Sequence, residues 1–278
     1  CARGATFSFD SHVARIETQG GAVSAVILAD GTRLPAGTVL FNGDPRALAT
    51  GLLGDGPAHV APQTKAAARS LSAEVWAFAA TPTGPDLAHH NVFFRDTAKP
   101  EFDAIAKGRS VPDPTLYLCA QDRGVPGGIP APERFEIIAN AAPLTRAPNE
   151  TEFETCRTRT FQTLARFGLT FDPPPGAETL TTPTGFERLF PATAGSLYGQ
   201  SPHGMTAAFR RPTARTAVPG LYLAGGGTHP GAGVPMATLS ARHAAEAIMQ
   251  DRCSTSPSRQ TAMRGGISTG SATIAGDR

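Results

Sequence analysis

The sequence predicts a mixed α/β protein in which short antiparallel strands precede a close-packed strand–loop–helix unit. Three observations predict this class. Alternating segments joined by Gly-containing turns fill residues 1–45, further strand candidates occupy residues 46–180, and an apolar strand, three glycines and an alanine-rich helix follow one another over residues 220–249. At 278 residues the chain is long enough for one large domain or two unequal ones with a buried core.

The first 45 residues are predicted to be strands joined by tight turns. The segment His12–Glu17 alternates polar and apolar residues, as a half-buried strand does, and Gly20-Gly21 predicts the turn to a partner strand over residues 22–28. The apolar run Val39–Phe41 then ends in the polar turn Asn42-Gly43-Asp44-Pro45. A strand that ends in this way can bring backbone close to a ligand, although many strands end so without one.

Residues 46–180 have a different residue pattern, in which strand candidates are separated by connections rich in Pro and Gly. The candidates are residues 73–80, 91–95, 115–121 and 134–141. Successive strands with such loops predict an antiparallel sheet. One helix is predicted from Asn149 to Phe167, because apolar residues recur at steps of three and four, Asn149 suits its cap and Gly168 its end.

The segment from Gly220 to Met249 carries the functional argument. Residues 221–224 form a candidate buried strand, and Gly225-Gly226-Gly227 follows at once, so that a ligand can lie against bare backbone. Pro235 suits the first turn of the next helix, whose N-terminus directs free N–H groups and a partial positive charge at the glycine loop. Nucleotide sites and tight structural turns both have this pattern. The G-x-G-x-x-G and P-loop spacings do not occur in the sequence.

The helix after the glycine loop is predicted to pack closely against a sheet through small side chains. Its predicted apolar stripe is Ala237, Ala241, Ala244, Ala245 and Ile248, and its polar stripe is Arg242, Glu246 and Gln250.

Composition excludes several classes of protein. With 40% hydrophobic and 17% charged residues the chain is globular, and a net charge of +2 gives no field that would recruit nucleic acid. No apolar run reaches the roughly 20 residues of a membrane span, and no signal-peptide pattern is found. The cysteines, which are Cys1, Cys119, Cys156 and Cys253, show no redox or ligand spacing and are expected to be free thiols. His89-His90 has no third ligand at metal spacing, so no metal site is expected.

Three stretches of the chain resemble bacterial carotenoid desaturases of the phytoene desaturase superfamily. The sequence GLYLAGGGTHPGAGVPMATLSARHAAEAI, residues 220–248, resembles the family's C-terminal signature. Residues 13–45 resemble its strand–turn–strand with an N-x-D-P turn near the flavin, and residues 186–212 the segment that precedes the signature. The sequence of the glycine loop resembles most that of the hydroxyneurosporene and methoxyneurosporene desaturases of purple phototrophic bacteria.

The resemblance implies a Rossmann-like, FAD-binding flavoprotein fold with an inserted antiparallel-sheet domain. Residues 1–48 and 181–252 would belong to the FAD-binding domain, residues 49–180 to the carotenoid (substrate) domain and residues 253–278 to a flexible tail. Family members begin with a strand–G-x-G-x-x-G–helix unit for the ADP half of FAD. This chain lacks that unit and opens in mid-pattern at Cys1. We therefore expect a partial sequence whose cofactor site is incomplete on its own.

In the family the glycine loop and its helix complete the FAD site around the ribityl chain and the flavin ring. The residues that the resemblance assigns to cofactor binding are Asp44, Gly225, Gly226, Gly227, Thr228, Gly233, Val234, Pro235 and Met236. His229 is the candidate catalytic residue. The alternative is a structural role, in which its ring is bonded to backbone. Asp44 before Pro45 is equally a common turn residue.

The implied activity is FAD-dependent desaturation of an acyclic carotenoid, of hydroxy- or methoxyneurosporene type at the 3,4 bond, by hydride transfer to the flavin. The 15 Phe residues, against 3 Tyr and 1 Trp, suit an apolar substrate channel, and core packing explains them equally well. A lipid-like substrate implies peripheral contact with the inner or photosynthetic membrane. The alternatives are a phytoene desaturase, a retinol saturase-like or amine oxidase-like flavin enzyme, or an inactive fragment. No nucleic-acid partner is expected.

Overall fold

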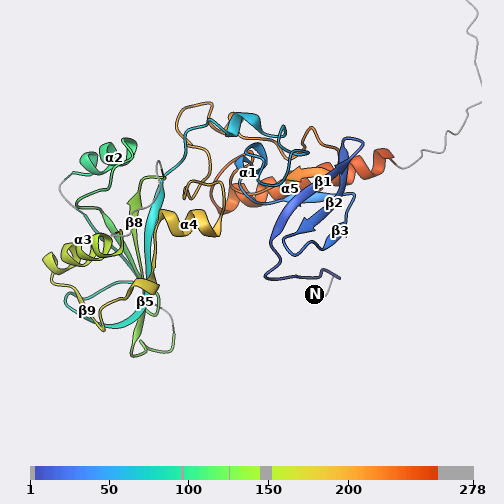
Figure 1. Ribbon diagram of the computed structural model, residues 1–278. Helices are drawn as coiled ribbons and strands as arrows, with labels where there is room; N and C mark the ends of the chain where they lie inside the picture. The colour runs from blue at the N-terminus through green and yellow to red at the C-terminus, as the bar shows by residue number, and fades with distance from the viewer. Residues whose placement is uncertain (1–3, 95–96, 125, 145–151, 256–278) are drawn as a thin grey trace, which may run out of the picture.

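The computed structural model describes residues 4–94, 97–124, 126–144 and 152–255. The chain forms two lobes side by side (Figure 1). One lobe contains strands β1 to β3 with helices α1 and α5, and the other contains a large sheet with α2 and α3. Helix α4 lies between the lobes (Figure 1).

The first lobe is built from the two ends of the described chain. β1 (Val13–Gln19), β2 (Ala22–Leu28) and β3 (Arg33–Pro35) form an antiparallel sheet, which confirms the predicted strand–turn–strand. β4 (Val39–Phe41) and β11 (Leu221–Leu223), both also predicted, pair in parallel. Apolar side chains from these elements pack into one core, which contains Ile16, Val23, Leu48, Leu53, Val218, Leu221 and Leu223.

Helix α5 (Val234–Thr255) packs against β11 and confirms the helix predicted after the glycine loop. Its predicted apolar stripe is partly wrong, because Ala241 and Ala245 are exposed while Ser240, Ala244 and Ala247 are buried. The physical reason is that the Ser240 hydroxyl accepts a hydrogen bond from the Gly225 N–H at 2.8 Å, which turns this polar residue toward the sheet. The predicted polar stripe is exposed, and Arg242 pairs with Glu246 on it at 2.8 Å.

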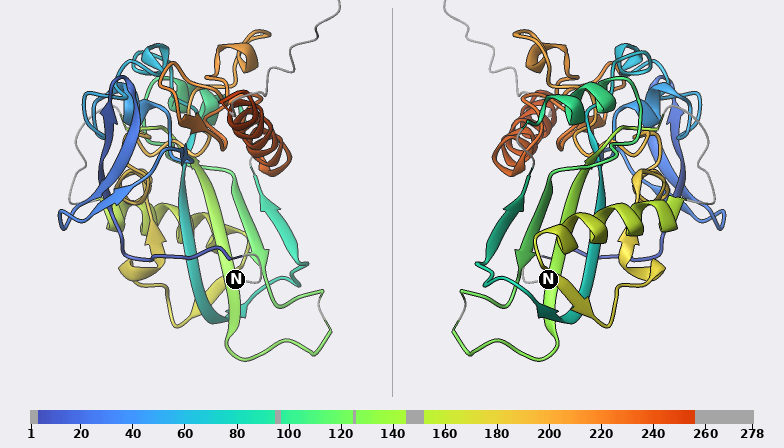
Figure 2. Two further views of the ribbon diagram at one scale, coloured as in Figure 1. Left: turned by 90° about the vertical axis from the view of Figure 1, so that its right-hand side faces the viewer. Right: turned by 90° about the vertical axis from the view of Figure 1, so that its left-hand side faces the viewer.

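The second lobe is an antiparallel sheet, as predicted. Its strand order is β10 (Leu180–Thr181), β5 (Ser72–Thr83), β8 (Glu133–Ala141), β7 (Leu116–Ala120) and β6 (His90–Phe93), and β9 (Thr170–Asp172) pairs with β5. The predicted helix is present as α3 (Glu152–Arg166), which lies across one face of the sheet (Figure 2). Its predicted cap, Asn149, lies outside the described residues.

The core between this sheet and α3 is rich in aromatic rings. Trp76 is fully buried, with ring centroids 5.8 Å from Phe153 and 5.0 Å from Phe161. Alternate residues of β7 and β8, including Leu116, Leu118, Phe135 and Ile137, complete this core. The other residues of these strands therefore face away from α3.

Short helices that the sequence did not predict join the main elements. They are α1 (Arg46–Ala49), α2 (Lys99–Ala106), α4 (Pro183–Leu189) and the 3₁₀ turns η1 (Pro62–Thr64), η2 (Ala177–Thr179) and η3 (Ala208–Arg210). Tertiary contacts hold α2, because the Glu101 carboxylate accepts hydrogen bonds from Thr115 N and Asn140 Nδ2, each at 3.0 Å. Within the described ranges, each helix falls short of the length or the apolar character that crossing a bilayer requires.

Replacing Trp76 tests how much the second core contributes to stability. We expect Trp76→Ala to lower the free energy of unfolding by about 3–5 kcal/mol, because it removes a large buried ring and leaves a cavity. Phe94→Ala is the matched control, since Phe94 is 66% exposed, and it should change stability little. Urea denaturation followed by far-UV circular dichroism measures both, and equal effects of the two substitutions would contradict the assigned core.

Candidate functional site

Two loops meet at one edge of the β4–β11 pair. The strands are parallel, so the turn after β4, residues 42–45, and the glycine loop after β11, residues 225–227, leave the sheet on the same side. The hydrogen bond from Ala224 N to the Phe41 carbonyl, at 3.1 Å, continues the pairing up to the loops. In open α/β sheets this carboxyl edge is where ligands bind.

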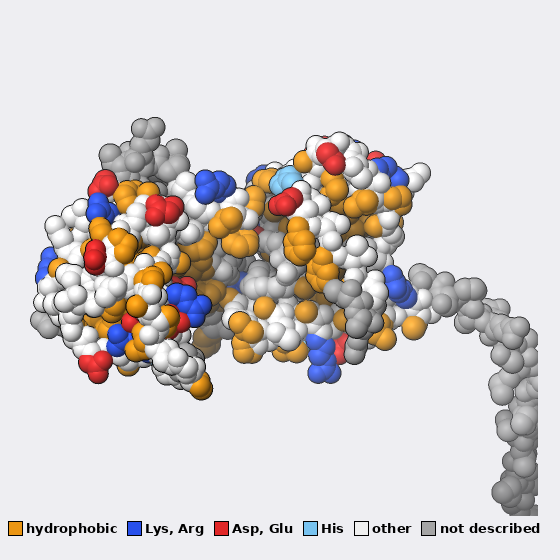
Figure 3. All heavy atoms as spheres, turned by 90° about the horizontal axis from the view of Figure 1, so that it is seen from below, with side chains coloured by type: hydrophobic (Ala, Val, Ile, Leu, Met, Phe, Trp, Pro, Cys, Tyr) orange, Lys and Arg blue, Asp and Glu red, His pale blue; other side chains and the backbone are white. Residues whose placement is uncertain are grey.

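A cavity of about 460 Å³ opens at this edge. Asn42, Gly43 and Asp44 line it on one side, together with Gly226 and Gly227. Its walls are mostly apolar side chains, which include Phe41, Leu52, Leu53, Phe186, Leu189, Phe190 and Leu197. Seen from below, the surface is indented between the two lobes and apolar side chains border the indentation (Figure 3).

The three glycines serve different purposes. A Cβ at Gly225, whose φ is +106°, would lie 2.5 Å from Asn42 Oδ1, and one at Gly227 would lie 2.6 Å from Pro45 Cδ. These two glycines are therefore required for packing against the turn after β4. A Cβ added at Gly226 would have Ala232 Cα as its nearest neighbour, at an ordinary 3.7 Å, so packing does not require a glycine here.

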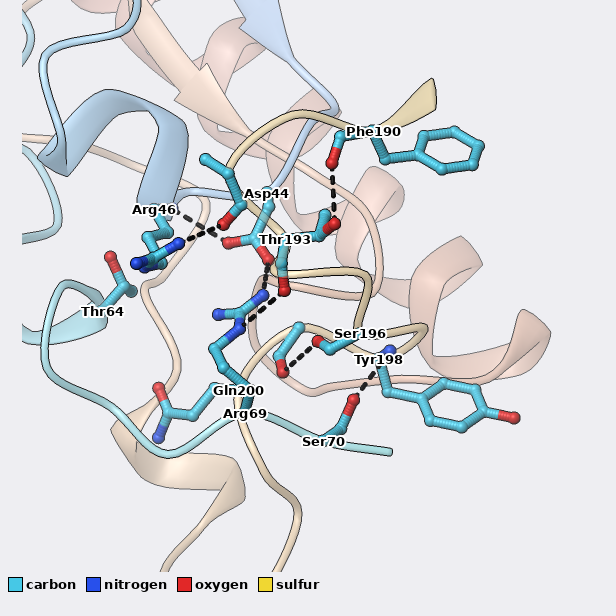
Figure 4. A network of polar contacts seen from close by, with 12 residues as sticks. Asp44, Arg46, Thr64, Arg69, Ser70, Phe190, Thr193, Ser196, Tyr198 and Gln200 are labelled. Atoms are coloured by element: carbon cyan, nitrogen blue, oxygen red, sulfur yellow. Dashed lines mark hydrogen bonds and ion pairs between the residues drawn. The ribbon is translucent and has the colours of Figure 1, made fainter. Parts of the chain in front are cut away.

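Asp44 connects three segments beside the cavity through nearly buried charges. One carboxylate oxygen accepts the Arg46 N–H at 2.9 Å and the other pairs with Arg69. Arg69 Nε also donates to the Thr193 carbonyl at 3.0 Å, and Arg46 Nη1 to the Ala192 carbonyl at 2.9 Å (Figure 4). The turn after β4, the approach to β5 and the segment after α4 are held together by these bonds.

Arg211 connects the glycine loop to the same network. Its buried guanidinium donates to the carbonyl oxygens of Gly226 at 2.6 Å, Gln200 at 2.7 Å and Tyr198 at 3.1 Å. Burial lowers the pKa of Arg211; the Asp44 carboxylate opposes this shift and the Arg69 charge adds to it. A planar guanidinium suits three carbonyls at fixed angles better than an ammonium does.

The structure brings some of the predicted cofactor residues to the cavity and leaves others away from it. Asp44, Gly226 and Gly227 line the cavity. Thr228 is fully buried behind the loop, and its hydroxyl has no hydrogen-bond partner in the described part of the chain. The remaining predicted residues, Gly233, Val234, Pro235 and Met236, are exposed at the start of α5 and do not line the cavity.

His229, the candidate catalytic residue, lies outside the cavity lining. Its Nδ1 is 3.1 Å from the Ala208 carbonyl oxygen, and its ring stacks with Phe209 and His243 at centroid distances of 6.1 and 6.4 Å. These contacts match the structural role that the sequence left open, in which the ring is bonded to backbone.

Sequence reasoning missed Arg69 and Arg211 as parts of the site. Neither lies in a motif with recognisable spacing, and Arg69 is far from its partners along the chain. Arg211 belongs to the Arg210-Arg211-Pro212 run that resembles the desaturases, but its contact with the glycine loop requires the fold.

The residues at the cavity fit a flavin. The apolar walls suit a ring system, and the turn after β4 and the glycine-loop backbone supply polar groups on one side of the cavity. The turn residues Asn42–Asp44 and the backbone of Gly226 and Gly227 are the groups that could hold it.

A comparison with models of known protein families gives a match around the glycine loop. A family model described as flavin containing amine oxidoreductase matches residues 140–249, which include the segment after α4, the glycine loop and most of α5. Over these residues the chain is similar to flavin-containing oxidoreductases.

Individual relatives narrow this class. The hydroxyneurosporene desaturases of Cereibacter sphaeroides and Rhodobacter capsulatus are 56% and 51% identical to this chain over an alignment that covers 91% of it. The hydroxyneurosporene desaturase of Rubrivivax gelatinosus is 45% identical over an alignment that covers 99% of the chain. The matched regions are 51%, 51% and 53% of the relatives, so the chain spans about half their length. Over that half, the chain is similar to the hydroxyneurosporene desaturases of these three bacteria.

A solved oxidoreductase from Methanosarcina mazei covers 86% of this chain and 48% of its own, at 14% identity and a TM-score of 0.41. A similarity of this degree supports no argument about function.

Removing the Asp44 carboxylate tests the network at the cavity. We expect Asp44→Ala to lower the free energy of unfolding by about 3–5 kcal/mol, because it leaves the Arg69 charge nearly buried and unpaired. Asp86→Ala is the matched control, because Asp86 also pairs with an arginine, Arg123, but its own side chain is fully exposed. Urea denaturation of both variants measures the difference, and equally small effects would show that the network contributes little.

Proposed function

We propose that the polypeptide containing this chain is an FAD-dependent desaturase, which introduces a C=C bond into an acyclic carotenoid of hydroxy- or methoxyneurosporene type at the 3,4 position. The observation that carries the proposal is the apolar cavity beside the glycine loop, in a chain 45–56% identical to three hydroxyneurosporene desaturases. Such a cavity suits a hydrocarbon substrate that must lie against a flat cofactor.

The contacts of the site support a division of labour among this chain's residues. The turn Asn42–Asp44 and the backbone of Gly226–Gly227 would hold the flavin. A bound FAD supplies the two-electron acceptor that desaturation requires. The apolar walls exclude water and orient the polyene. Both oxygens of Asp44 are engaged, with Arg46 N and Arg69, so its contacts support positioning rather than proton transfer.

Assays of the full-length enzyme test the proposal directly. The purified protein is loaded with FAD and incubated with hydroxyneurosporene in liposomes, and the products are separated by chromatography. We expect a product with one more conjugated double bond, seen as a red-shifted absorption spectrum. Phytoene, retinol and a primary amine are offered in parallel, and turnover of one of these with none of hydroxyneurosporene would contradict the proposal.

We also propose that the enzyme contacts the membrane surface where its cavity opens. Leu189 and Phe190, at the end of α4, line the cavity and are 60% and 61% exposed. Exposed apolar side chains beside a cavity for a lipid-like substrate suit contact with the bilayer that dissolves this substrate.

Flotation with liposomes tests the membrane contact. We expect the double variant Leu189→Ser/Phe190→Ser to bind liposomes about tenfold or more weakly, because each apolar side chain contributes on the order of 1.5 kcal/mol when it is buried. Met249→Ser is the control, since Met249 is 67% exposed on α5 and does not line the cavity. Unchanged flotation of the double variant would refute contact at this point.

A further inference from the structure

The edge of the large sheet brings together three side chains that can bind a metal. The antiparallel register of β6 and β7 places His90 directly opposite Cys119, and His89 immediately precedes β6. The ligand atoms of His89, His90 and Cys119 all lie within 4.8 Å of one another. The sequence shows no third ligand at metal spacing beside His89-His90, and strand pairing brings Cys119 there from a distant part of the chain.

The three side chains lie on the face of the sheet that α3 does not cover. Leu118 and Ala120 of β7 face the core beneath α3, so Tyr117 and Cys119 point to the opposite face. The left panel of Figure 2 looks onto this face, and the right panel shows α3 in front of the other. Because β6 is the last strand in the sheet order, the cluster also lies at an edge.

The pair formed by His89 and Cys119 already has the spacing of zinc ligands. His89 Nε2 is 3.6 Å from Cys119 Sγ. A tetrahedral Zn²⁺ with Zn–N of about 2.0 Å and Zn–S of about 2.3 Å separates these two atoms by about 3.5 Å. The His90 ligand atom lies within 4.8 Å of both, and its exposed side chain is free to move closer.

Hydrogen bonds orient the histidines as they do in metal sites. His89 Nδ1 is 2.6 Å from the Arg123 carbonyl oxygen. A carbonyl only accepts, so Nδ1 carries the proton and Nε2 directs its lone pair at Cys119; this support from the other ring nitrogen is the usual arrangement around bound zinc. The Tyr117 hydroxyl, 2.7 Å from His90 Nδ1, also holds the second ring in place, but a hydroxyl both donates and accepts, so this contact does not select the His90 tautomer.

The surrounding charges favour a cation. Glu136 of β8 lies opposite Cys119 in the sheet register. Two arginines near the cluster are paired with carboxylates: Arg123 with Glu133 at 2.7 Å and Asp86 at 3.3 Å, and Arg134 with Asp122. We propose that His89, His90 and Cys119 form a Zn²⁺ site that clamps the edge strand β6 to β7, with the fourth coordination position open to water.

Cobalt substitution in the full-length protein tests the site. The chelator-treated protein is titrated with Co²⁺ and then with Zn²⁺. We expect one Co²⁺ per chain with tetrahedral d–d bands and a thiolate-to-cobalt charge-transfer band, both removed by Zn²⁺. Cys119→Ser should abolish the charge-transfer band, and His89→Gln and His90→Gln, which each remove a ligand, should weaken Zn²⁺ binding by more than the roughly 10–100-fold that loss of an outer-shell partner costs.

Two matched controls separate the site from other thiols and imidazoles. Cys253→Ser and His59→Gln replace exposed residues of the same types away from the cluster and should leave the spectrum and the affinity unchanged. His90→Gln changes an exposed side chain, so its effect is independent of folding, and circular dichroism checks all variants. Absence of the charge-transfer band in the unaltered protein, or its persistence in Cys119→Ser, would overturn the proposal.

Discussion

The parallel pairing of β4 with β11 is the constraint on which the rest of the structure depends. Parallel neighbours cannot be joined by a tight turn, so the chain must leave after Phe41 and return before Leu221. The whole second lobe lies within that connection. The same pairing sets the turn after β4 and the glycine loop at one edge of the sheet, where the cavity opens.

Buried charges then fix the loops that the strands bring together. Asp44 and Arg69 are stable near the interior because each neutralises the other, while Asp44 Oδ1 accepts the Arg46 N–H and Arg69 Nε donates to the Thr193 carbonyl. The Arg211 guanidinium donates hydrogen bonds to three carbonyl oxygens that are not paired within a strand or helix. A cavity with polar groups at one side and apolar walls is the result.

The sheet of the second lobe shows how strand register creates chemistry. Alternation sends one set of β7 side chains into the core beneath α3 and the other set to the open face. His90 and Cys119 meet there because they are register partners. The Arg123 carbonyl then determines which nitrogen of His89 is free. The cavity and this cluster thus both depend on pairing between distant segments.

The sequence alone located the elements with a clear period and showed the similarity to known proteins. Alternation located β1, recurrence at three and four residues located α3, and the wording of residues 220–248 identified a carotenoid desaturase relative. Tertiary structure decided the rest. Contacts of Glu101 hold α2, and the hydrogen bond between Ser240 and Gly225 accompanies the buried face of α5. The contacts of Arg69 with Asp44 and of Cys119 with His89 join segments that are distant in the sequence. Periodicity is a local property that can be read directly from a sequence. Contacts between distant segments depend on how all the elements pack together in the fold.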